Sequence, residues 1–500
     1  MSKKLLALLL VIATTAITFV SCANTQGEIT TTTEDRINSS TPVLGGLNFP
    51  SEGFSDDDLV VYVAYVEDNV GFTRRSLQAD ELDETAVDIK TLERDQRLKS
   101  QLGLELYIDP VTSDFHNMES VIGTALAAGE SDYDVIAGYQ YFGISMATKG
   151  YLYDLSKLDS ENADYIDLKA PYWGEAYNDN LSYNGAYYWI TGDIALRYIG
   201  GMYCTFVNSS IYTDKLEAAY GSIYDIAKHG KWTIDLLTTM ASACYDDNGT
   251  TPGEADPEDQ YGFGWEAQDP MDGLAMGMNV EFAYKNNETG EVIITFNNKH
   301  TIAVSEKIAA LANNKAFSYK FDSSDSANTM NAFASGSIAF TVNKLFQAEA
   351  YLSEMEDDYY IIPTPKFDEN QTNYITAIHD GCTIFGITHC SEKIRQSAAA
   401  LEFLCAYSHS LVAPEYYEGA LKGRYTRDPY AAEMIDIIHT NVSTDFAAAW
   451  SNSINGIVHT FRDGRALKSS DLNRKQGTWN ESLKKLLNDL TTVQENNESA

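Results

Sequence analysis

Strands and helices are predicted to alternate between residues 59 and 137, and this alternation restricts the fold more than any other feature of the chain. Residues 59–66 (LVVYVAYV), 104–108 (LELYI) and 133–137 (YDVIA) are short runs rich in β-branched and aromatic side chains, as is typical of buried strands. Residues 85–102 and 118–128 separate these runs and carry apolar side chains at helical spacing. This order predicts βαβ units, which form a parallel sheet with helices on its faces. The fold class is therefore α/β.

A chain of 500 residues is too long for one hydrophobic core, because single cores stop growing at roughly 250–300 residues. We therefore expect two domains. Further strands are predicted at 202–207, 338–342, 359–365 and 382–387. Further helices are predicted at 232–245, 328–334, 392–407, 429–439, 445–450 and 479–490.

The first 22 residues are organised like a bacterial export signal. Two lysines lead, residues 5–20 are apolar or small, and small residues precede a cut site. The apolar run is shorter than the ~20 residues of a membrane-spanning helix, and no charged flank follows it. We expect a signal peptide at 1–21.

Residue Cys22 ends a sequence, Val20-Ser21-Cys22, that resembles a lipobox. In a lipobox the cysteine becomes the lipid-bearing first residue of the mature chain. Phe19 stands where leucine is usual, so an ordinary signal with an incidental cysteine is the alternative. Lipidation at Cys22 predicts a protein that is exported and anchored by lipid to the outer face of the bacterial cytoplasmic membrane.

Residues 22–55 are predicted to be a flexible linker. They are rich in Ser, Thr, Asn and Gly, as in TTTT at 30–33 and NSST at 38–41. Such a segment has too few apolar side chains to offset the entropy of ordering. A flexible stretch of about 28 residues reaches roughly 30 Å, which is enough to hold a globular body just off a membrane.

The formal net charge of −37 limits the classes of partner. Nucleic acid and anionic lipid both require neutralisation of phosphate, so neither is expected as a partner. An acidic surface also repels anionic ligands from a distance, which favours neutral or cationic small ligands. Solubility alone is an equally good reason for such a surface.

The cysteine pattern predicts neither a disulfide framework nor a metal site. Besides Cys22 the chain has Cys204, Cys244, Cys382, Cys390 and Cys405, an odd number. Cys382 and Cys390 bracket an apolar segment, so the sequence allows them to pair. None of the cysteines has zinc-ligand spacing.

A series of short motifs follows in a fixed order along the chain. The motifs are YDVIA at 133–137, KGYLYDL at 149–155, NGAYY at 184–188, FVN at 206–208, KWT at 231–233, FASGSIAF at 333–340 and YIIPTPK at 360–366. Each is weak alone, but in this order they resemble the extracellular solute-binding proteins of ABC importers, in the group that includes the maltose-type (family 1) sugar-binding lipoproteins. The resemblance covers about residues 56–490.

The resemblance implies a periplasmic-binding-protein-like fold of type II, with two discontinuous lobes joined by a hinge. Lobe 1 would comprise 56–196 and 370–425, lobe 2 would comprise 197–369 and 426–490, and 491–500 would be a tail. Ligand would bind between the lobes, where the carboxyl ends of strands in open α/β sheets form a crevice. The implied partners are a small solute, expected to be a sugar, and ABC permease subunits. We expect a monomer without a cofactor.

Candidate ligand-binding residues are aromatic or polar side chains near strand ends and near the implied crossovers. Aromatic rings cover the flat C–H faces of sugars, and carboxylate, amide and cationic groups pair with the hydroxyls. The candidates are Tyr139, Gln140, Tyr141, Asp193, Trp265, Asn343, Lys344, His379, Asp380 and Trp450. The chain has 32 Tyr, 20 Phe and 6 Trp, so most aromatic side chains must be packed in the core, which is the alternative for each aromatic candidate.

The acidic loop at 246–259 is where relatives often carry an EF-hand-like calcium loop. Such a loop needs oxygen ligands at positions 1, 3 and 5 and glycine at position 6. Asp246 and Asn248 fit this pattern, whereas Thr250 and Thr251 do not. We predict a solvated acidic loop and no metal.

No catalytic motif is present: the sequence has no GxSxG elbow, no HExxH and no P-loop. We therefore expect a receptor rather than an enzyme, with no catalytic residue. It would capture its solute by hinge closure and deliver it to an ABC permease. The alternative is a surface glycan-binding lipoprotein or a sensor that is not coupled to transport. A peptide or polyamine as solute remains open.

Overall fold

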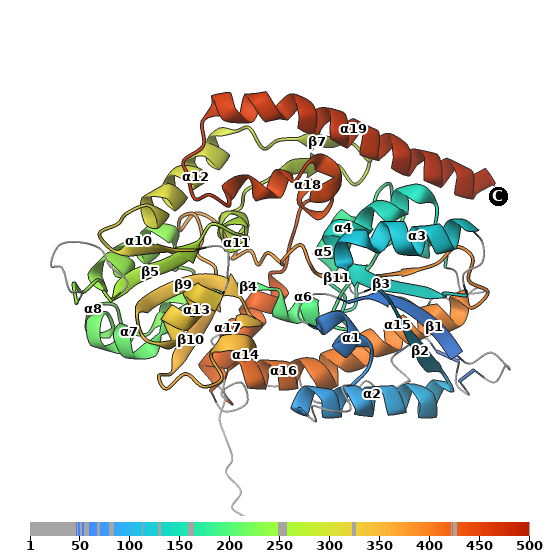
Figure 1. Ribbon diagram of the computed structural model, residues 1–500, viewed down its shortest axis with the longest axis horizontal. Coiled ribbons are helices and arrows are strands. Elements are labelled where there is room, and N and C mark those ends of the chain that lie inside the picture. Colours follow the sequence, from blue (N-terminus) through green and yellow to red (C-terminus); the bar gives the residue numbers. More distant parts are fainter. Residues whose placement is uncertain are drawn as a thin grey trace, which may run out of the picture. The chain divides into compact units, whose positions relative to one another are not determined.

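The computed structural model describes residues 47, 49–50, 53–54, 60–67, 71–79, 85–112, 114–128, 132–158, 165–248, 258–322, 327–421, 423 and 428–499. The predicted signal peptide, the predicted lipidation site at Cys22 and most of the predicted linker lie outside these residues. Ser39–Ala500 forms one compact unit. Its two larger sheets are separate, and we call the parts around them lobe 1 and lobe 2 (Figure 1).

Lobe 1 contains the βαβ units expected from the sequence. Its sheet has the order β11-β3-β1-β2, formed by β1 (Val60–Val66), β2 (Glu105–Thr112), β3 (Val135–Tyr139) and β11 (Thr383–Ile387). Strands β2, β1 and β3 are parallel, as predicted, whereas β11 joins antiparallel to β3. The connections are α2 (Ala86–Leu102) and α3 (Met118–Ala128), at the positions that the helical spacing predicts.

The ends of α2 show how local sequence determines a helix. The Thr85 side chain accepts a hydrogen bond from the Asp88 N–H, which satisfies one of the exposed amides at the helix start. Gly103 ends the helix at a φ of 75°, and its N–H donates to the Lys99 carbonyl. Such a left-handed end favours glycine because glycine has no Cβ.

Lobe 2 has a five-stranded mixed sheet of order β10-β4-β9-β5-β8. Its strands are β4 (Tyr203–Asn208), β5 (Tyr261–Glu266), β8 (Ser318–Phe321), β9 (Ile338–Lys344) and β10 (Tyr359–Pro363). β4 is antiparallel to β9 and β10, and β5 is parallel to β8 and β9. The helices of this lobe include α10 (Ile234–Ala243), α12 (Lys299–Ala312) and α13 (Ala327–Ala334).

Strand β5 was not predicted, because its two glycines lower its strand propensity. Packing explains both of them. A Cβ at Gly262 would lie 1.8 Å from the Ala241 carbonyl oxygen of α10, and one at Gly264 would lie 2.2 Å from Ile338 of β9. The glycines therefore allow a helix and a neighbouring strand to approach β5 closely. Strand β8 and helix α12 were also absent from the predicted elements.

Two segments that cross between the lobes run side by side at the hinge. The Tyr203 N–H donates to the Ala377 carbonyl at 2.9 Å, and the His379 N–H donates to the Gly201 carbonyl at 3.0 Å. A third crossing follows α15 (Ile394–Tyr407), the π-helix η5 (Ser408–Val412) and α16 (Ala413–Ala420). It leads to α17 (Pro429–Thr440), which packs against β10 of lobe 2. The exact domain boundaries stay a prediction.

The C-terminal segment differs from the prediction. The sequence predicts a short helix at 479–490 followed by a tail, whereas the structure has one long helix. Helix α19 (Ser469–Ser499) has 31 residues and follows α18 (Phe446–Ala449), η6 (Ser451–Ile454) and η7 (Ile457–Phe461). It packs on η3 (Ile144–Lys149) of lobe 1 and on β7 (Val292–Ile294), which pairs with β6 (Ala283–Lys285) (Figure 1). It therefore bridges the two lobes.

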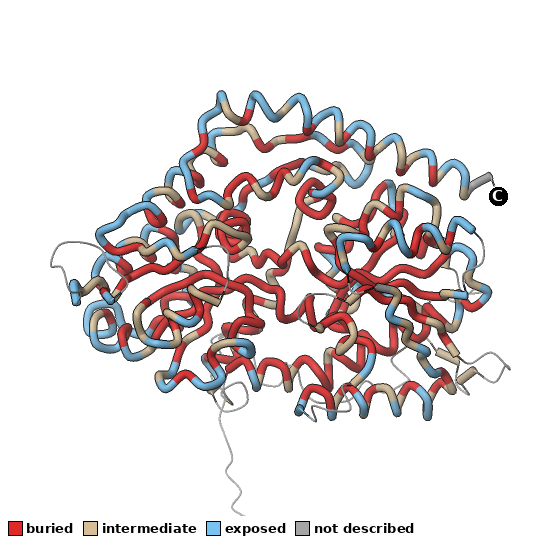
Figure 2. The backbone as a smooth tube through the Cα atoms, viewed as in Figure 1, coloured by how far each residue is buried: buried red, intermediate tan, exposed pale blue. Residues whose placement is uncertain are grey.

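The remaining short elements connect these parts. They are α1 (Phe72–Leu77), η2 (Phe115–Asn117), α4 (Gln140–Gly143), η4 (Leu155–Lys157), α5 (Glu175–Leu181), α6 (Leu196–Gly200), α7 (Ser209–Lys215), α8 (Glu217–Tyr220), α9 (Ile223–Lys228), α11 (Pro270–Gly277) and α14 (Gln347–Tyr351). The central strands β1, β3, β4, β9 and β11 are largely buried, whereas β2 at the edge of the lobe 1 sheet and the outer faces of α2 and α19 are partly exposed (Figure 2). Among the helices of the described residues, none combines the length and the apolar character needed to cross a bilayer.

The five cysteines in the described part of the chain are all thiols, so Cys382 and Cys390 do not pair. The acidic loop at 246–259 lies partly outside the described residues. Its first residue, Asp246, forms an ion pair with Lys215 at 2.7 Å.

Glu402 of α15 gives lobe 1 an expected pH-dependent stability. Its carboxyl accepts hydrogen bonds from the Trp173 indole, the Tyr172 hydroxyl and the Asp167 amide, yet burial raises its pKa to about 7 from an ordinary value of 4.5. Between these two pH values the folded state holds a proton that the unfolded chain has released. The free energy of unfolding should therefore fall by about 2–3 kcal/mol as pH rises through this window.

Urea unfolding at pH 5 and pH 8 would measure this loss. The variant Glu402→Gln should lose less stability over the same window, while the exposed Glu354→Gln should behave like the unmodified protein. An equal decline in all three proteins would contradict the assignment.

Candidate functional site

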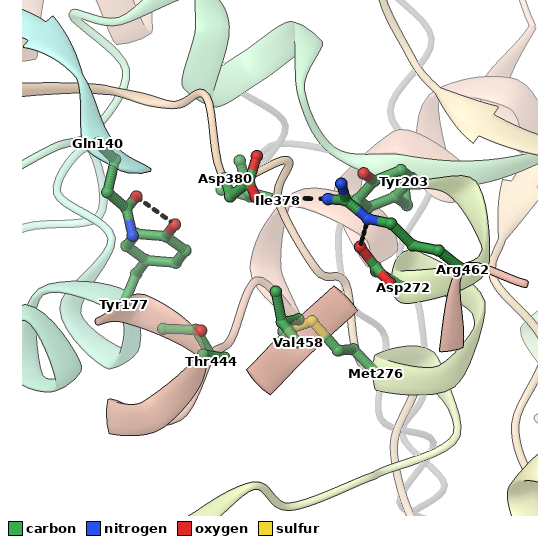
Figure 3. Close-up of a pocket in the computed structure, with 11 residues that line it drawn as sticks. Gln140, Tyr177, Tyr203, Asp272, Met276, Ile378, Asp380, Thr444, Val458 and Arg462 are labelled. Carbon is green, nitrogen blue, oxygen red and sulfur yellow. Dashed lines mark hydrogen bonds and ion pairs between the residues drawn. The ribbon is translucent and has the colours of Figure 1, made fainter. Parts of the chain in front are cut away.

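A small pocket lies where the two lobes and the C-terminal segment meet (Figure 3). Gln140 and Tyr177 lie on one side of it, Tyr203, Asp272 and Arg462 on the other, with Asp380 between them. The complete lining is Gln140, Tyr177, Tyr203, Asp272, Met276, Ile378, Asp380, Thr444, Ala448, Val458 and Arg462. Its volume of about 20 Å³ has room for about one water molecule.

Strand ends and crossovers bring these side chains together. Gln140 directly follows β3, Tyr203 begins β4, and Asp272 lies on α11, which follows β5. Ile378 and Asp380 lie on the second crossing segment, beside the hinge hydrogen bonds. The pocket therefore occupies the edge at which open α/β sheets bind ligands.

Carboxylates and cations form a connected network at this pocket. The Arg462 Nε donates to Asp272 Oδ2 at 2.6 Å, and its Nη2 lies 3.5 Å from Asp380 Oδ2. The Lys344 Nζ donates to Asp269 Oδ2 at 2.6 Å, and the Tyr203 hydroxyl donates to the same oxygen at 2.8 Å. Both cations are thus neutralised by protein carboxylates, which disfavours an anionic ligand here.

Two histidines complete the network. His459 Nε2 lies 3.0 Å from Asp380 Oδ2, and His379 Nε2 lies 3.6 Å from a carboxylate oxygen of both Asp269 and Asp380. Burial lowers the pKa of His379 to about 4, although both carboxylates oppose this shift. Burial alone would raise the pKa of Asp380, but the hydrogen bond from His459 and the nearby cationic groups together outweigh burial and hold the pKa below its ordinary value. Asp380 is therefore charged and His379 neutral near pH 7.

A second contact joins lobe 1 to the C-terminal segment across the pocket. The Gln140 Nε2 donates to the Ala449 carbonyl at 3.0 Å, and the Tyr177 hydroxyl donates to Gln140 Oε1 at 2.6 Å. The Asn452 side chain donates to the Tyr141 carbonyl at 2.7 Å. These bonds close the pocket from the side of α18 and η6.

Six of the sequence-predicted site residues gather at or beside the pocket. Gln140 and Asp380 line it. The Tyr141 ring stacks on His459 with centroids 5.2 Å apart. Lys344 and His379 both contact Asp269, which belongs to the charged network beside the pocket. Tyr139 is one contact further away: its ring lies 6.2 Å from His379 and stacks on Phe115 at 4.8 Å.

The other four candidates lie away from this pocket. Trp265 is buried in lobe 2, where its indole donates to the Ala312 carbonyl at 2.7 Å. Trp450 is buried and stacks on Phe446 at 5.8 Å, and Asn343 is buried within β9. Asp193 is bonded to two histidines elsewhere at the hinge. A role in ligand binding stays a prediction for all ten residues.

Several lining residues were not found from the sequence. Tyr177 and Arg462 come from segments without a strand-end signal, and only the tertiary fold brings them to the pocket beside Asp272. The usable signal for Asp272 is DPMDG at 269–273, where acidic residues open helix α11 shortly after β5 ends. Arg462 carries no comparable local signal.

No protein-family model and no curated protein matches the sequence. Solved structures share its fold over most of the chain. The galacto-N-biose/lacto-N-biose I-binding protein of an ABC transporter from Bifidobacterium longum, in complex with lacto-N-biose, is 13% identical, with a TM-score of 0.57 over 86% of this chain and 99% of its own. The sugar-binding protein MalE from Xanthomonas citri is 12% identical, with a TM-score of 0.56 over 88% and 100% of the two chains.

A third solved structure shows a different ligand on the same fold. UgpB from Mycobacterium tuberculosis, in complex with glycerophosphocholine, is 14% identical, with a TM-score of 0.52 over 88% of this chain and 99% of its own. At such identities the comparison establishes the fold. The chain has the two-lobe fold of the maltose-type solute-binding proteins, which confirms at the level of the fold the resemblance that the motifs indicate.

Proposed function

We propose that this chain is a membrane-tethered extracellular receptor that captures a small carbohydrate between its lobes and delivers it to an ABC permease. The interlobe pocket is the observation that carries the proposal. Tyrosine rings, a buried amide and paired carboxylates converge there, and these groups suit the faces and hydroxyls of a sugar. The solved proteins that share the fold include an ABC-transporter component bound to lacto-N-biose.

The pocket chemistry favours a neutral solute. Arg462 and Lys344 are engaged by Asp272 and Asp269, so neither is available to an anionic group without breaking an ion pair. Asp272 Oδ1 is buried and has no hydrogen-bond partner among the described residues. A ligand hydroxyl that meets this oxygen would remove the cost of leaving it unpaired.

Solute entry requires the lobes to separate, because a pocket of about 20 Å³ is far below the roughly 300 Å³ or more of a small-molecule site. The hydrogen bonds from Gln140 to Ala449 and from Asn452 to Tyr141 would break on opening. Hydrogen bonds to the solute would replace them when the lobes close, because re-forming both would restore a pocket too small for a sugar.

A thermal-shift screen of Ser39–Ala500 against neutral sugars, oligosaccharides, glycerophosphodiesters, amino acids and polyamines tests this proposal. A ligand at 100 times its dissociation constant should add about 2.7 kcal/mol of stability. With the ligand found, Asp380→Asn should weaken binding at least ten-fold, since it removes a charge from the pocket lining. The control Asp463→Asn alters a half-exposed carboxylate that pairs with Arg465 outside the pocket, and should bind normally. Absence of any small-molecule shift, or equal binding by both variants, would refute the proposal.

The tether to the membrane has its own test. Cys22→Ser should move the protein from the membrane fraction to the medium or the soluble fraction, because a lipobox without its cysteine accepts no lipid. Cys390→Ser is the matched control and should remain membrane-bound. If both variants remain membrane-bound, lipidation at Cys22 is contradicted.

A glycan-binding lipoprotein or sensor that is not coupled to transport is the second candidate. It predicts the same binding but no uptake. Cells lacking the chain should lose uptake of the identified solute if the chain serves a permease, and should keep it if the chain serves a sensor.

A further inference from the structure

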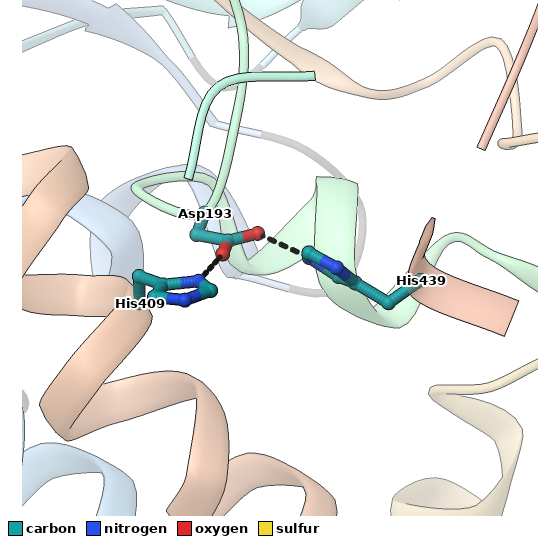
Figure 4. Close-up of side chains that lie close together, drawn as sticks. All are labelled: Asp193, His409 and His439. Atoms are coloured by element: carbon teal, nitrogen blue, oxygen red, sulfur yellow. Dashed lines mark hydrogen bonds and ion pairs between the residues drawn. The ribbon is translucent and has the colours of Figure 1, made fainter. Parts of the chain in front are cut away.

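Three side chains with metal-binding chemistry meet at the hinge, outside the pocket described above (Figure 4). The His409 Nδ1 lies 2.5 Å from Asp193 Oδ2, and the His439 Nε2 lies 2.8 Å from Asp193 Oδ1. The carboxylate is therefore approached by one imidazole at each oxygen. One ligand atom from each of the three residues lies within 4.8 Å of the other two.

The three residues come from three different segments of the hinge region. Asp193 precedes α6 on the first crossing, His409 lies on the π-helix η5, and His439 lies in the last turn of α17. A π-turn inside a helix is rare and is often found at functional sites. Here it interrupts the long helical run from α15 to α16 at the turn that carries His409.

We propose that Asp193, His409 and His439 form a binding site for a divalent transition-metal ion of the zinc type. Two imidazole nitrogens and one carboxylate oxygen are the ligands that Zn²⁺ and its neighbours prefer. Calcium and magnesium prefer an all-oxygen shell and are not expected here. Three protein ligands leave a fourth position for water.

Burial and access both suit such a site. The Asp193 side chain is 1% exposed and the His439 side chain 10%, so two ligands are held within the protein. The His409 side chain is 21% exposed, which gives an ion a path from solvent. Aromatic rings surround the imidazoles: Tyr172 lies beside His409, and Tyr198 and Tyr417 lie beside His439. These rings limit the orientations of the ligands.

A bound ion would tie the hinge together. His409 follows α15 of lobe 1, His439 belongs to α17 beside β10 of lobe 2, and Asp193 lies on a segment that joins the lobes. The ion would hold all three segments at fixed distances and so would bias the angle between the lobes. The site is independent of the solute's identity, so its test stands apart from that of the proposed function.

The test is titration of EDTA-treated protein with ZnCl₂, CoCl₂ and MgCl₂, without solute. We expect one Zn²⁺ per chain at micromolar or lower dissociation constant, a rise in melting temperature with Zn²⁺ but not Mg²⁺, and a visible Co²⁺ spectrum typical of nitrogen and oxygen ligands. His409→Ala should weaken Zn²⁺ binding at least 50-fold. The control His116→Ala removes an exposed histidine that also pairs with an aspartate, Asp114, and should bind like the unmodified protein.

The Co²⁺ spectrum and stoichiometry of the unmodified protein keep the test valid if a variant fails to fold. Absence of Zn²⁺ binding, or equal binding by His409→Ala and the unmodified protein, would overturn the proposal. The three side chains would then be a hydrogen-bonded cluster that only stabilises the hinge.

Discussion

Replacing Lys344 by methionine is expected to lower the free energy of unfolding by about 3–5 kcal/mol, the usual cost of removing one partner from a buried ion pair. The Lys344 side chain is 6% exposed and that of Asp269 15%, and their charged atoms are 2.6 Å apart. Burial alone would raise the pKa of Asp269, but the Lys344 charge and the other groups that face the carboxylate together outweigh burial and hold the pKa well below the ordinary value. Without Lys344 the carboxylate would remain largely buried, with the Tyr203 hydroxyl and His379 beside it.

The double variant Lys344→Met/Asp269→Asn separates the charge from the packing. It removes both charges and should recover most of the stability, because a buried pair and a neutral replacement are often similar in stability. Chemical denaturation of both variants at pH 7 is the measurement. A loss below about 1 kcal/mol in the single variant, or the same loss in both variants, would show that this ion pair does not govern the stability of the pocket.

Replacing Trp265 by alanine is expected to cost about 3–5 kcal/mol of stability, typical for a buried tryptophan. The ring is 2% exposed, its indole nitrogen donates to Ala312, and the backbone at Gly464 packs against it so closely that a Cβ there would lie 2.6 Å from the ring. Lys320 lies over the same ring at 5.2 Å. If the ring serves the core alone and does not contact the solute, affinity for the solute, measured well below the melting temperature, should change less than two-fold.

The variant Trp265→Phe decides whether the Trp265 ring acts in core packing or in ligand binding. It keeps most of the apolar volume and should lose about half as much stability as the alanine variant. Calorimetry with the solute gives the affinity of each variant. A ten-fold loss of affinity at unchanged stability would place Trp265 at the ligand instead of in the core.

Most of the lobe 1 sheet could be predicted, because its strands are continuous runs of β-branched and aromatic residues. Residues 59–66 and 133–137 coincide with β1 and β3 to within two residues. Strand β5 was missed because it contains Gly262 and Gly264. These glycines are required by the close packing of a helix and a strand against β5, which no local sequence pattern reveals. The length of α19 was missed because only a narrow stripe of a mostly polar helix is buried.

Site residues could be predicted from the sequence only where they stand next to the end of a strand. Gln140 follows β3 and Asp380 precedes β11, and both line the pocket. Arg462 lies more than 80 residues further along the chain than Asp380, and it reaches the pocket only because η7 packs against α11. Only one residue of the cluster at the hinge was predicted. Asp193 was selected for its place beside the crossover, whereas its two histidine partners, His409 and His439, come from remote helices and were not found.

Helix α19 has a consequence for how tightly any solute can be held. Near its start the Asn473 side chain accepts a hydrogen bond from Asn297 of lobe 2, and near its end Gln494 donates to the Tyr183 carbonyl of lobe 1. Opening the lobes must break one of these attachments. Every 1.4 kcal/mol that the helix adds to the closed arrangement shifts the ratio of closed to open molecules ten-fold. Mutations on this outer helix can therefore adjust the apparent affinity and the rate of solute release without touching the solute.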